Sequence, residues 1–385
     1  MPYYASRGVI PHKRHTQFRA PDGRLYTEEL FGTEGFSGVH SLLYHVTPPT
    51  NVQEARLLGT ITPALAPDGP LIHRHFKTQG LMPKDADAIE GRQMLLGNDD
   101  VAMGVAVISK GMSYFYRTAE GDELFYIHTG TGTIETVFGD LAYRSGDYLV
   151  LPVGTTYRVM PSGEKPTRML VIESRGAITP PPRYLNDFGQ YMEHAPYCER
   201  DLRLPELHTH DEQGEFEVRV RARGVLTSYT LSYHPQDVIG WDGALYPYAF
   251  NIEDFEPITG RVHQPPPVHQ TFAGKGFVIC SFVPRKLDYH PLSIPVPYHH
   301  SNIESDEVLY YVDGQFMSRR GIEVGSVTLH PGGIAHGPHP GIVEKSLGAT
   351  ETAELAVMMD TFKPLHVFTD ALSCEDPAYM YSWRE

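Results

Sequence analysis

Several side chains that can bind a transition metal lie close together in the last third of the sequence. Glu307 begins the pattern E-x6-G, and His336 ends the pattern G-x5-P-x-G-x2-H. His299 and His300 stand a few residues before Glu307. Two imidazoles and one carboxylate bind a metal and leave coordination positions open, as in non-heme Fe(II) oxygenases. Glu307, His336 and one histidine of the adjacent pair therefore predict an Fe(II) site. Neighbouring strand residues point to opposite faces, so only one of the pair can face the metal.

The same two patterns occur once earlier in the chain, in the same order. Glu123 begins the first E-x6-G, and the second pattern ends at Tyr157 instead of a histidine. Two spaced patterns in the same order predict two related β units. Tyr116 and Arg117 precede Glu123, and no histidine stands at the ligand positions. We therefore expect no metal in the first unit.

The residues around the second copy explain how strands would present the ligands. Proline cannot donate to a β-ladder, so Pro331 marks the end of a strand. Gly333 permits the tight turn that aims His336 inward. Glu307 shares a strand face with the apolar Leu309. A carboxylate that points into an apolar barrel needs a partner, and a metal is a suitable one.

The elements that would position these residues are short strands. The 385 residues include 36 Gly, 32 Pro, 23 Tyr and 17 Phe, a composition that favours many strands joined by turns. From about Val101, runs rich in Val, Ile, Tyr and Phe are bounded by Gly, Asp and Pro, as in a sandwich or barrel. The segment Gln79–Asp100, which contains AIEGRQMLLG, is the best candidate for a short helix. The first 30 residues suggest an extended arm or edge strands.

Charge and cysteine usage exclude several classes of protein. The formal net charge of −15 argues against a broad nucleic-acid-binding surface. No apolar run is long enough to span a membrane, and the N-terminus lacks the apolar core of a signal peptide. Three cysteines lie far apart and outside any CxxC pair, which favours free thiols in a reducing compartment. We expect a cytoplasmic protein.

Two other histidine pairs are weaker metal candidates. His73 and His75 form an H-x-H pair, but no E-x6-G follows at the required distance. His208 and His210 lie in a polar stretch, for which an exposed loop is the better interpretation. Neither pair is expected to form the main site.

The repeated patterns resemble the two signature motifs of the cupin superfamily, a small jelly-roll β-barrel. More closely, the chain resembles the homogentisate 1,2-dioxygenase family in three blocks, which are the N-terminal region 11–30, Tyr298–Gly314 and Leu329–Pro338. The resemblance implies an all-β bicupin fold with an extended N-terminal β region. It also implies two domains. Residues 1–257 would hold the metal-free cupin unit at about 111–175, and residues 258–385 would carry the iron.

The resemblance also implies roles for individual residues. The family's iron ligands fall on His300, Glu307 and His336, and its active-site histidine falls on His263. His330 would be a second catalytic histidine, six positions before the last ligand. Residues expected to contact substrate are Tyr298, His336 and Phe316. Asp313 and Phe316 replace an Arg and a Tyr of the family pattern, so the substrate is less constrained than the metal centre.

The activity implied is ring cleavage of homogentisate by O2 to maleylacetoacetate, in phenylalanine and tyrosine catabolism. No organic cofactor is required, which agrees with the lack of a nucleotide-binding motif. One alternative is a bicupin dioxygenase for gentisate or another hydroxylated aromatic acid. A second alternative is a metal-dependent cupin isomerase or a small-molecule binder without O2 chemistry. The partners expected are the aromatic acid and O2, with no nucleic acid or membrane, and the family suggests a homo-oligomer based on trimers.

Overall fold

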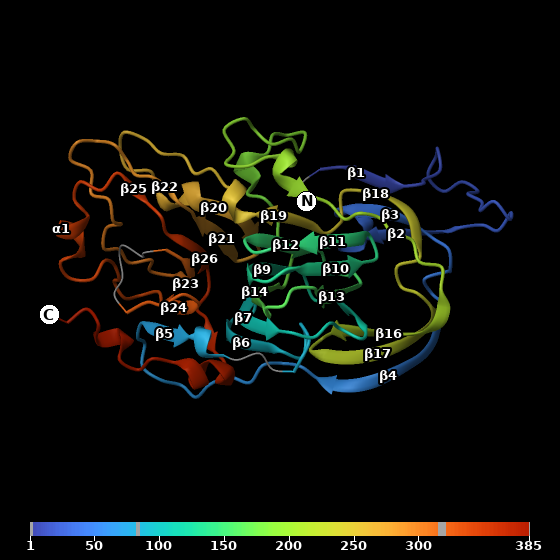
Figure 1. Cartoon of the computed structure of the whole chain (residues 1–385), viewed down its shortest axis with the longest axis horizontal. Coiled ribbons are helices and arrows are strands. Elements are labelled where there is room, and N and C mark those ends of the chain that lie inside the picture. Colours follow the sequence, from blue (N-terminus) through green and yellow to red (C-terminus); the bar gives the residue numbers. More distant parts are fainter. Residues whose placement is uncertain (1–2, 82–84, 315–320, 385) are drawn as a thin grey trace.

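The computed structural model describes residues 3–81, 85–314 and 321–384, which fold mainly into β-sheets (Figure 1). Within these ranges the α-helix is α1 (Ile342–Ser346). The 3-10 turns are Glu34–Phe36, Thr78–Gly80, Pro182–Tyr184, Glu199–Asp201, Ile252–Asp254, Pro266–His269, Thr369–Cys374 and Tyr379–Tyr381. The all-β fold with few short helices is confirmed. No helix in the described part of the chain is long and apolar enough to cross a membrane.

The first β unit is built on an eight-stranded sheet. Its strands, in spatial order, are β15 (Leu202–Arg203), β19 (Tyr248–Asn251), β12 (Asp147–Leu151), β9 (Glu123–Thr129), β14 (Thr167–Ser174), β7 (Val101–Ile108), β6 (Arg92–Gly97) and β27 (His366–Val367).

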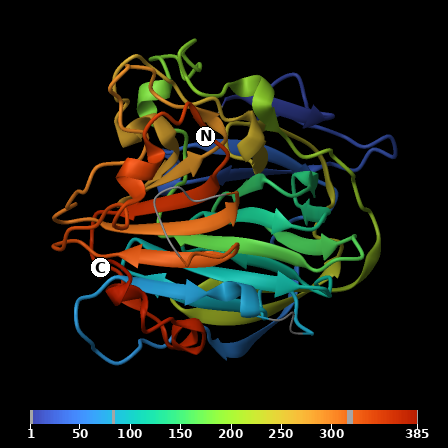
Figure 2. The ribbon, with the colours of Figure 1, turned by 60° about the vertical axis from the view of Figure 1, so that its left-hand side comes forward.

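The second β unit is built on a six-stranded sheet, which faces the viewer in Figure 2. Its strands, in spatial order, are β5 (Arg74–Lys77), β24 (Ser326–His330), β23 (Asp306–Asp313), β26 (Leu355–Thr361), β21 (Phe277–Phe282) and β20 (Gln270–Gly274). A short pair, β22 (Arg285–Lys286) and β25 (Glu351–Thr352), lies beside it.

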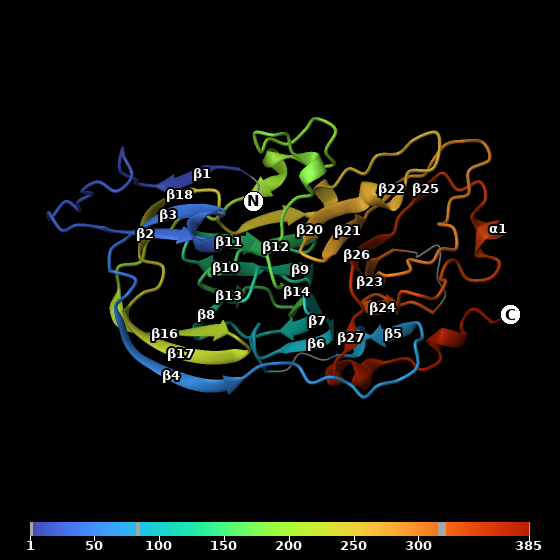
Figure 3. The ribbon, with the colours of Figure 1, turned by 180° about the vertical axis from the view of Figure 1, so that it is seen from behind.

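The remaining strands form two further sheets. A seven-stranded sheet has the order β11 (Gly139–Tyr143), β10 (Gly132–Thr136), β13 (Tyr157–Pro161), β8 (Phe115–Thr118), β16 (Gln213–Ala222), β17 (Val225–Tyr233) and β4 (Val52–Thr60). A four-stranded sheet has the order β1 (Ala5–Gly8), β18 (Val238–Gly243), β3 (His40–His45) and β2 (Thr27–Gly32). Figure 3 shows β16, β17 and β4 curving opposite β2 and β3.

The two units share one strand register, which explains why the sequence patterns repeat. Glu123 of β9 pairs with Leu151 and Glu173, whereas Glu307 of β23 pairs with His330 and Asp360. The six glycines of the two pattern copies have φ between 80° and 99°, a region that residues with a Cβ rarely adopt. They are Gly130, Gly146, Gly154, Gly314, Gly325 and Gly333. Each turn of the pattern therefore requires its glycine.

The helix expected within Gln79–Asp100 is wrong. The Asp87 carboxylate accepts the N–H groups of Ile89 and Glu90 and holds a turn there. The chain then runs as β6 and pairs with β7. Pairing with a buried neighbouring strand outweighs a weak local helix propensity.

Each large sheet borrows a strand from the other half of the sequence. β5 pairs with β24, and β27 pairs with β6. The division at residues 257 and 258 stays a prediction, and these two strands cross it.

Candidate metal centre and its cavity

A two-residue backbone bridge brings two of the predicted ligands together. The N–H of His300 donates to the carbonyl of His336 and the N–H of His336 donates to the carbonyl of His300, each at 2.9 Å. Residues that exchange both hydrogen bonds lie directly opposite each other. Their ring centroids are consequently only 4.1 Å apart.

Glu307 provides a carboxylate between these rings. Its Oε2 lies 3.6 Å from Nε2 of His300, and its Oε1 lies 3.4 Å from Nε2 of His336. One nitrogen or oxygen atom from each of the three residues lies within 4.8 Å of the others. Burial opposes ionisation, but interactions of the carboxylate with the His300, His330 and His336 imidazoles outweigh it and hold the pKa of Glu307 well below its usual range. The group therefore combines one negative charge with two imidazole nitrogens.

His336 supplies a test of whether a metal fits this group. Its side chain is 1% exposed, and neither ring nitrogen forms a hydrogen bond with any described residue. A buried nitrogen without a hydrogen bond is costly unless another partner uses it. The donor set of His300, Glu307 and His336 suits a first-row transition metal. His299 is exposed and lies outside the group within the described chain.

His330 lies behind the carboxylate. Its Nδ1 is 2.7 Å from Oε1 of Glu307, and its Nε2 is 3.1 Å from the hydroxyl of Tyr379. The ring stacks on His336 at 4.7 Å and is fully buried. It is not among the described residues that line the neighbouring cavity. This placement suits a group that positions Glu307 rather than one that touches substrate.

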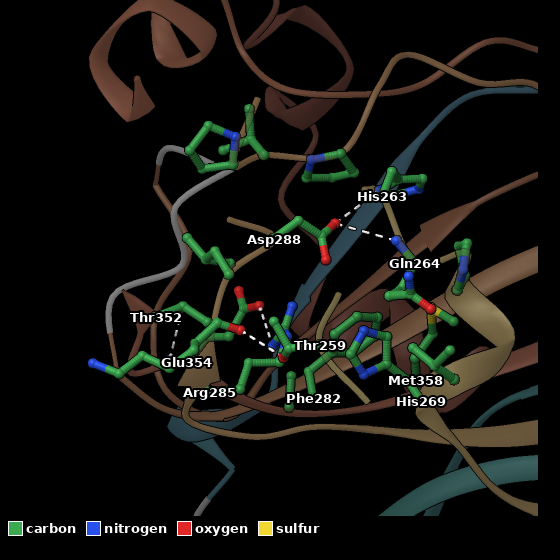
Figure 4. A pocket seen from close by; sticks show the side chains of 18 of the residues that line it. Thr259, His263, Gln264, His269, Phe282, Arg285, Asp288, Thr352, Glu354 and Met358 are labelled. Carbon is green, nitrogen blue, oxygen red and sulfur yellow. Dashed lines mark hydrogen bonds and ion pairs between the residues drawn. The ribbon is translucent and has the colours of Figure 1, made fainter. Parts of the chain in front are cut away.

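A cavity of about 190 Å³ opens from His300 and Glu307. Its apolar wall includes Leu309, Ala356 and Met358, on strands β23 and β26. Figure 4 shows the side chains around it. Apolar walls with a few convergent polar groups are typical of small-molecule sites.

His263 and Tyr298 stand near the mouth of this cavity. His263 lines the cavity with its side chain 54% exposed. Its Nδ1 lies 3.6 Å from Oδ2 of Asp288, which also accepts the N–H of Gln264 at 3.1 Å (Figure 4). The Tyr298 ring is 5.2 Å from the ring of His263 and 6.0 Å from that of His300. The sequence therefore pointed to residues that do lie at one site.

The sequence did not point to His269, which also lines the cavity. It is 8% exposed, and its Nδ1 forms no hydrogen bond with a described residue. Burial, followed by the charges of Arg285 and His263, lowers the pKa of His269 to about 3, so the ring is neutral near pH 7. Its ring lies 4.6 Å from Phe282. Strand pairing through β20 and β21 places it here, and no local pattern marks it.

Two charged residues beside the site were also missed. Burial and the charge of Glu307 raise the pKa of Asp360 to about 7, and His300 opposes this shift. Arg285 lines the cavity and pairs with Glu354 at 3.1 Å.

The equivalent place in the first unit is occupied differently. Tyr116 pairs with Tyr157 across β8 and β13, as His300 pairs with His336. Nη1 of Arg92 lies 2.5 Å from Glu123 and 2.6 Å from Glu173, and Nη2 lies 3.1 Å from the Tyr157 hydroxyl. Burial and then the charge of Glu123 raise the pKa of both tyrosines, so both phenols stay protonated. A buried guanidinium occupies this centre.

The weaker histidine candidates have other contacts. His75 contacts Ser326 at 2.8 Å, and Nε2 of His73 lies 3.2 Å from the carbonyl of Ala335. His208 contacts Asp140 at 3.0 Å.

His210, Glu212 and His234 form a second group that could hold a metal within the described chain. There, however, Nδ1 of His234 accepts the N–H of Gln236 at 3.1 Å.

The two positions that depart from the family pattern lie elsewhere. Asp313 ends β23, and Phe316 lies outside the described residues.

Comparisons with known proteins identify the family to which the chain belongs. A family model described as "Homogentisate 1,2-dioxygenase N-terminal" matches residues 5–252. A Saccharolobus solfataricus protein, provisionally named a dioxygenase, is 42% identical over all of this chain and 99% of its own length. A homogentisate 1,2-dioxygenase of Bradyrhizobium diazoefficiens is 26% identical over 94% of this chain and 86% of its own length.

Among solved structures, a cupin 2 conserved barrel domain protein from Leptotrichia buccalis covers 76% of this chain and 97% of its own. It is 11% identical, with a TM-score of 0.33. The family model covers well over half of the sequence and includes the first unit with its buried guanidinium. The chain belongs to the homogentisate 1,2-dioxygenase family.

Proposed function

We propose that the protein is a dioxygenase that uses Fe(II) to cleave the ring of a hydroxylated aromatic acid, with homogentisate as the leading substrate. The observation that carries the proposal is the His300–Glu307–His336 group at a cavity that also contains His263. The names of the two relatives support the same reaction class. With homogentisate the product would be maleylacetoacetate, in phenylalanine and tyrosine catabolism.

His300, Glu307 and His336 would hold the iron, which would supply Lewis-acid and redox chemistry to substrate and O2. The apolar side chains of Leu309, Ala356 and Met358 would contact the aromatic ring and exclude water from it.

His263 would take the proton from a ring hydroxyl. Asp288, 3.6 Å from its Nδ1, favours the tautomer with the proton on Nδ1 and leaves Nε2 free to act as a base. The neutral His269 can accept a hydrogen bond from a second polar group of the substrate. The substrate carboxylate would lie toward Arg285, a cation in the cavity wall.

The test is O2 consumption by the protein reconstituted with Fe(II), with homogentisate, gentisate and 4-hydroxyphenylacetate supplied separately. Uptake of one O2 per homogentisate supports the proposal, and uptake with gentisate alone would reassign the substrate. Binding without O2 uptake for every acid would favour a cupin isomerase or binding protein. The His336→Ala variant is the matched control, because it keeps the cavity wall but removes a proposed ligand.

We also propose that the protein acts in the cytoplasm as a homo-oligomer, in keeping with its three free cysteines. Size-exclusion chromatography with light scattering tests the oligomer, and a trimer or a multiple of three is expected.

A further inference from the structure

A second cavity lies between the sheets of the N-terminal region, away from the metal centre. Its volume is about 230 Å³, and it lies between β2 and β3 on one side and β8, β16 and β17 on the other. Apolar side chains form much of its wall, including Leu43, Val218 and Leu231. No described residue lines both this cavity and the one beside Glu307.

Arg117 projects into this second cavity. Successive residues of a strand point to opposite faces, so Tyr116 faces the interior of the first unit and Arg117 faces the cavity. Its side chain is exposed and lines the cavity, so the guanidinium is accessible to a ligand there.

Among the described residues, the guanidinium of Arg117 hydrogen-bonds to a neutral group. Its Nε and Nη2 both donate to the hydroxyl of Thr156, at 2.8 and 2.5 Å. It forms no ion pair with any described residue. Its remaining donors are therefore available to an anionic ligand, and a guanidinium binds a carboxylate through two parallel hydrogen bonds.

Glu29, the carboxylate in the wall of this cavity, forms an ion pair with His45. Glu29 lines the cavity and lies 2.9 Å from Nε2 of His45, and Asp237 lies 2.7 Å from the other ring nitrogen. Burial alone would lower the pKa of His45, but these two carboxylates outweigh burial and raise it to about 9. His45 is therefore charged near pH 7 and forms ion pairs with both carboxylates.

From this arrangement we infer that the second cavity binds a small organic monocarboxylate, with its carboxylate on Arg117 and its apolar part against Leu43, Val218 and Leu231. The planar guanidinium fork matches a carboxylate in geometry. Glu29 on the same wall repels a second negative charge, which disfavours a dianion such as phosphate. Tyr229 and Tyr233 also line the cavity and offer hydroxyl groups to the ligand.

The test is calorimetric titration of the full-length protein with benzoate, in the His336→Ala background so that the metal centre does not contribute. Binding of one benzoate per chain is expected. Arg117→Gln should weaken it at least tenfold, because the carboxylate loses its charged partner. Val218→Phe, which fills the cavity but keeps Arg117, should weaken it as well. Both variants are first checked for an unchanged thermal unfolding midpoint.

Probes of different charge decide the ligand class. Benzyl alcohol and inorganic phosphate should bind much more weakly than benzoate. Equal binding of benzyl alcohol would overturn the carboxylate assignment. No benzoate binding, or binding that survives both Arg117→Gln and Val218→Phe, would overturn the site itself. These outcomes do not depend on the dioxygenase proposal, because the titration uses neither iron nor O2.

Discussion

The two β units have the same strand register but differ in the residues around their buried glutamates, Glu123 and Glu307. Glu123 follows Tyr116 by seven positions, and Glu307 follows His300 by seven positions. In each unit the first residue of this pair is bridged to the end of the second pattern, at Tyr157 or His336. What differs is the source of positive charge near the glutamate.

In the first unit the chain provides its own cation. Arg92 on β6 reaches the Glu123 carboxylate with its side chain only 6% exposed. β6 and β20 occupy equivalent places in their sheets, next to β7 and β21. Continuing the register of β20 puts Val268 and His269 where Arg92 and its neighbour lie.

The second unit therefore has no arginine in this place. The His269 ring is neutral, and a cavity is left beside Glu307. An arginine at this place accompanies a closed structural unit, and its absence accompanies an open one, for which we propose that a bound metal supplies the positive charge.

The largest effect is expected from the matched pair His336→Ala and Tyr157→Phe. His336→Ala should lose most bound iron and nearly all activity, because only two protein ligands remain. Tyr157→Phe should leave the iron content unchanged. Metal analysis by mass spectrometry and O2 uptake measure both. Equal loss of metal in the two variants would contradict the assignment of the metal to the second unit.

The next pair distinguishes two adjacent histidines. His300→Ala should lose iron to a similar extent as His336→Ala, because His300 belongs to the close group. His299→Ala should retain it. A structure of the metal-bound protein would show directly which of the two histidines has a ring nitrogen at about 2.1 Å from the metal. Iron loss confined to His299→Ala would reverse the assignment.

Turnover should fall by about 10²–10⁴-fold in His263→Phe, the usual range for a general acid–base group. Iron content should not change, since His263 lies outside the ligand group. Asp288→Asn should give a smaller loss and alter the pH profile, because Asp288 acts only through His263. If His263→Phe turns over within a fewfold of the parent at every pH, His263 has no part in proton transfer.

Arg92→Leu tests how much the buried guanidinium contributes to the free energy of unfolding. It leaves Glu123 and Glu173 buried without their partner, and breaking a buried ion pair in this way costs about 3–5 kcal/mol. Urea unfolding, followed by circular dichroism, measures the loss. The double variant Arg92→Leu/Glu123→Gln should recover part of it. A loss below about 1 kcal/mol in Arg92→Leu would mean that the guanidinium does not hold this unit together.

The smallest expected effect is the dependence of the protein's stability on pH, through the carboxylates around Arg92. Burial raises the pKa of Glu173, but the charges of Arg92 and Arg221 outweigh it and hold the pKa below its usual range. A folded-state pKa below the ordinary value of about 4.3 gives stability that is present above that pH and lost as the pH falls. The urea midpoint should therefore drop as the pH falls below about 5. The drop should be smaller in Glu173→Gln, and an equal drop in both proteins would assign the effect to other carboxylates.

The sequence predicted the parts of this comparison that are encoded locally. The glycine turns and the glutamate at the head of each strand depend on a few neighbouring residues, and the structure has them where the patterns placed them. The local patterns could not reveal Arg92. It lies 31 residues before Glu123, inside a segment whose composition suggested a helix.

Contacts that depend on sheet assembly were missed for the same reason. His269 enters the cavity through the pairing of β20 with β21, and Arg117 faces its cavity only because β8 lies opposite β2 and β3. The family resemblance implied a catalytic role for His330, which stays a prediction. Its contacts with Glu307 and Tyr379 could not be read from local patterns.

The borrowed strand β5 has a consequence for synthesis of the chain. His75 contacts Ser326, a residue 251 positions later. At about 5–20 residues per second, the ribosome needs roughly 10 to 50 s to make the intervening polypeptide. During that interval β5 has no strand partner, because β24, with which it pairs in the complete sheet, has not yet been made. The strands of the first unit up to β19 have by then all been made, whereas the sheet that carries Glu307 can be completed only after β26 has been made. The newly made protein should therefore become able to bind metal late, after most of its structure can already have formed.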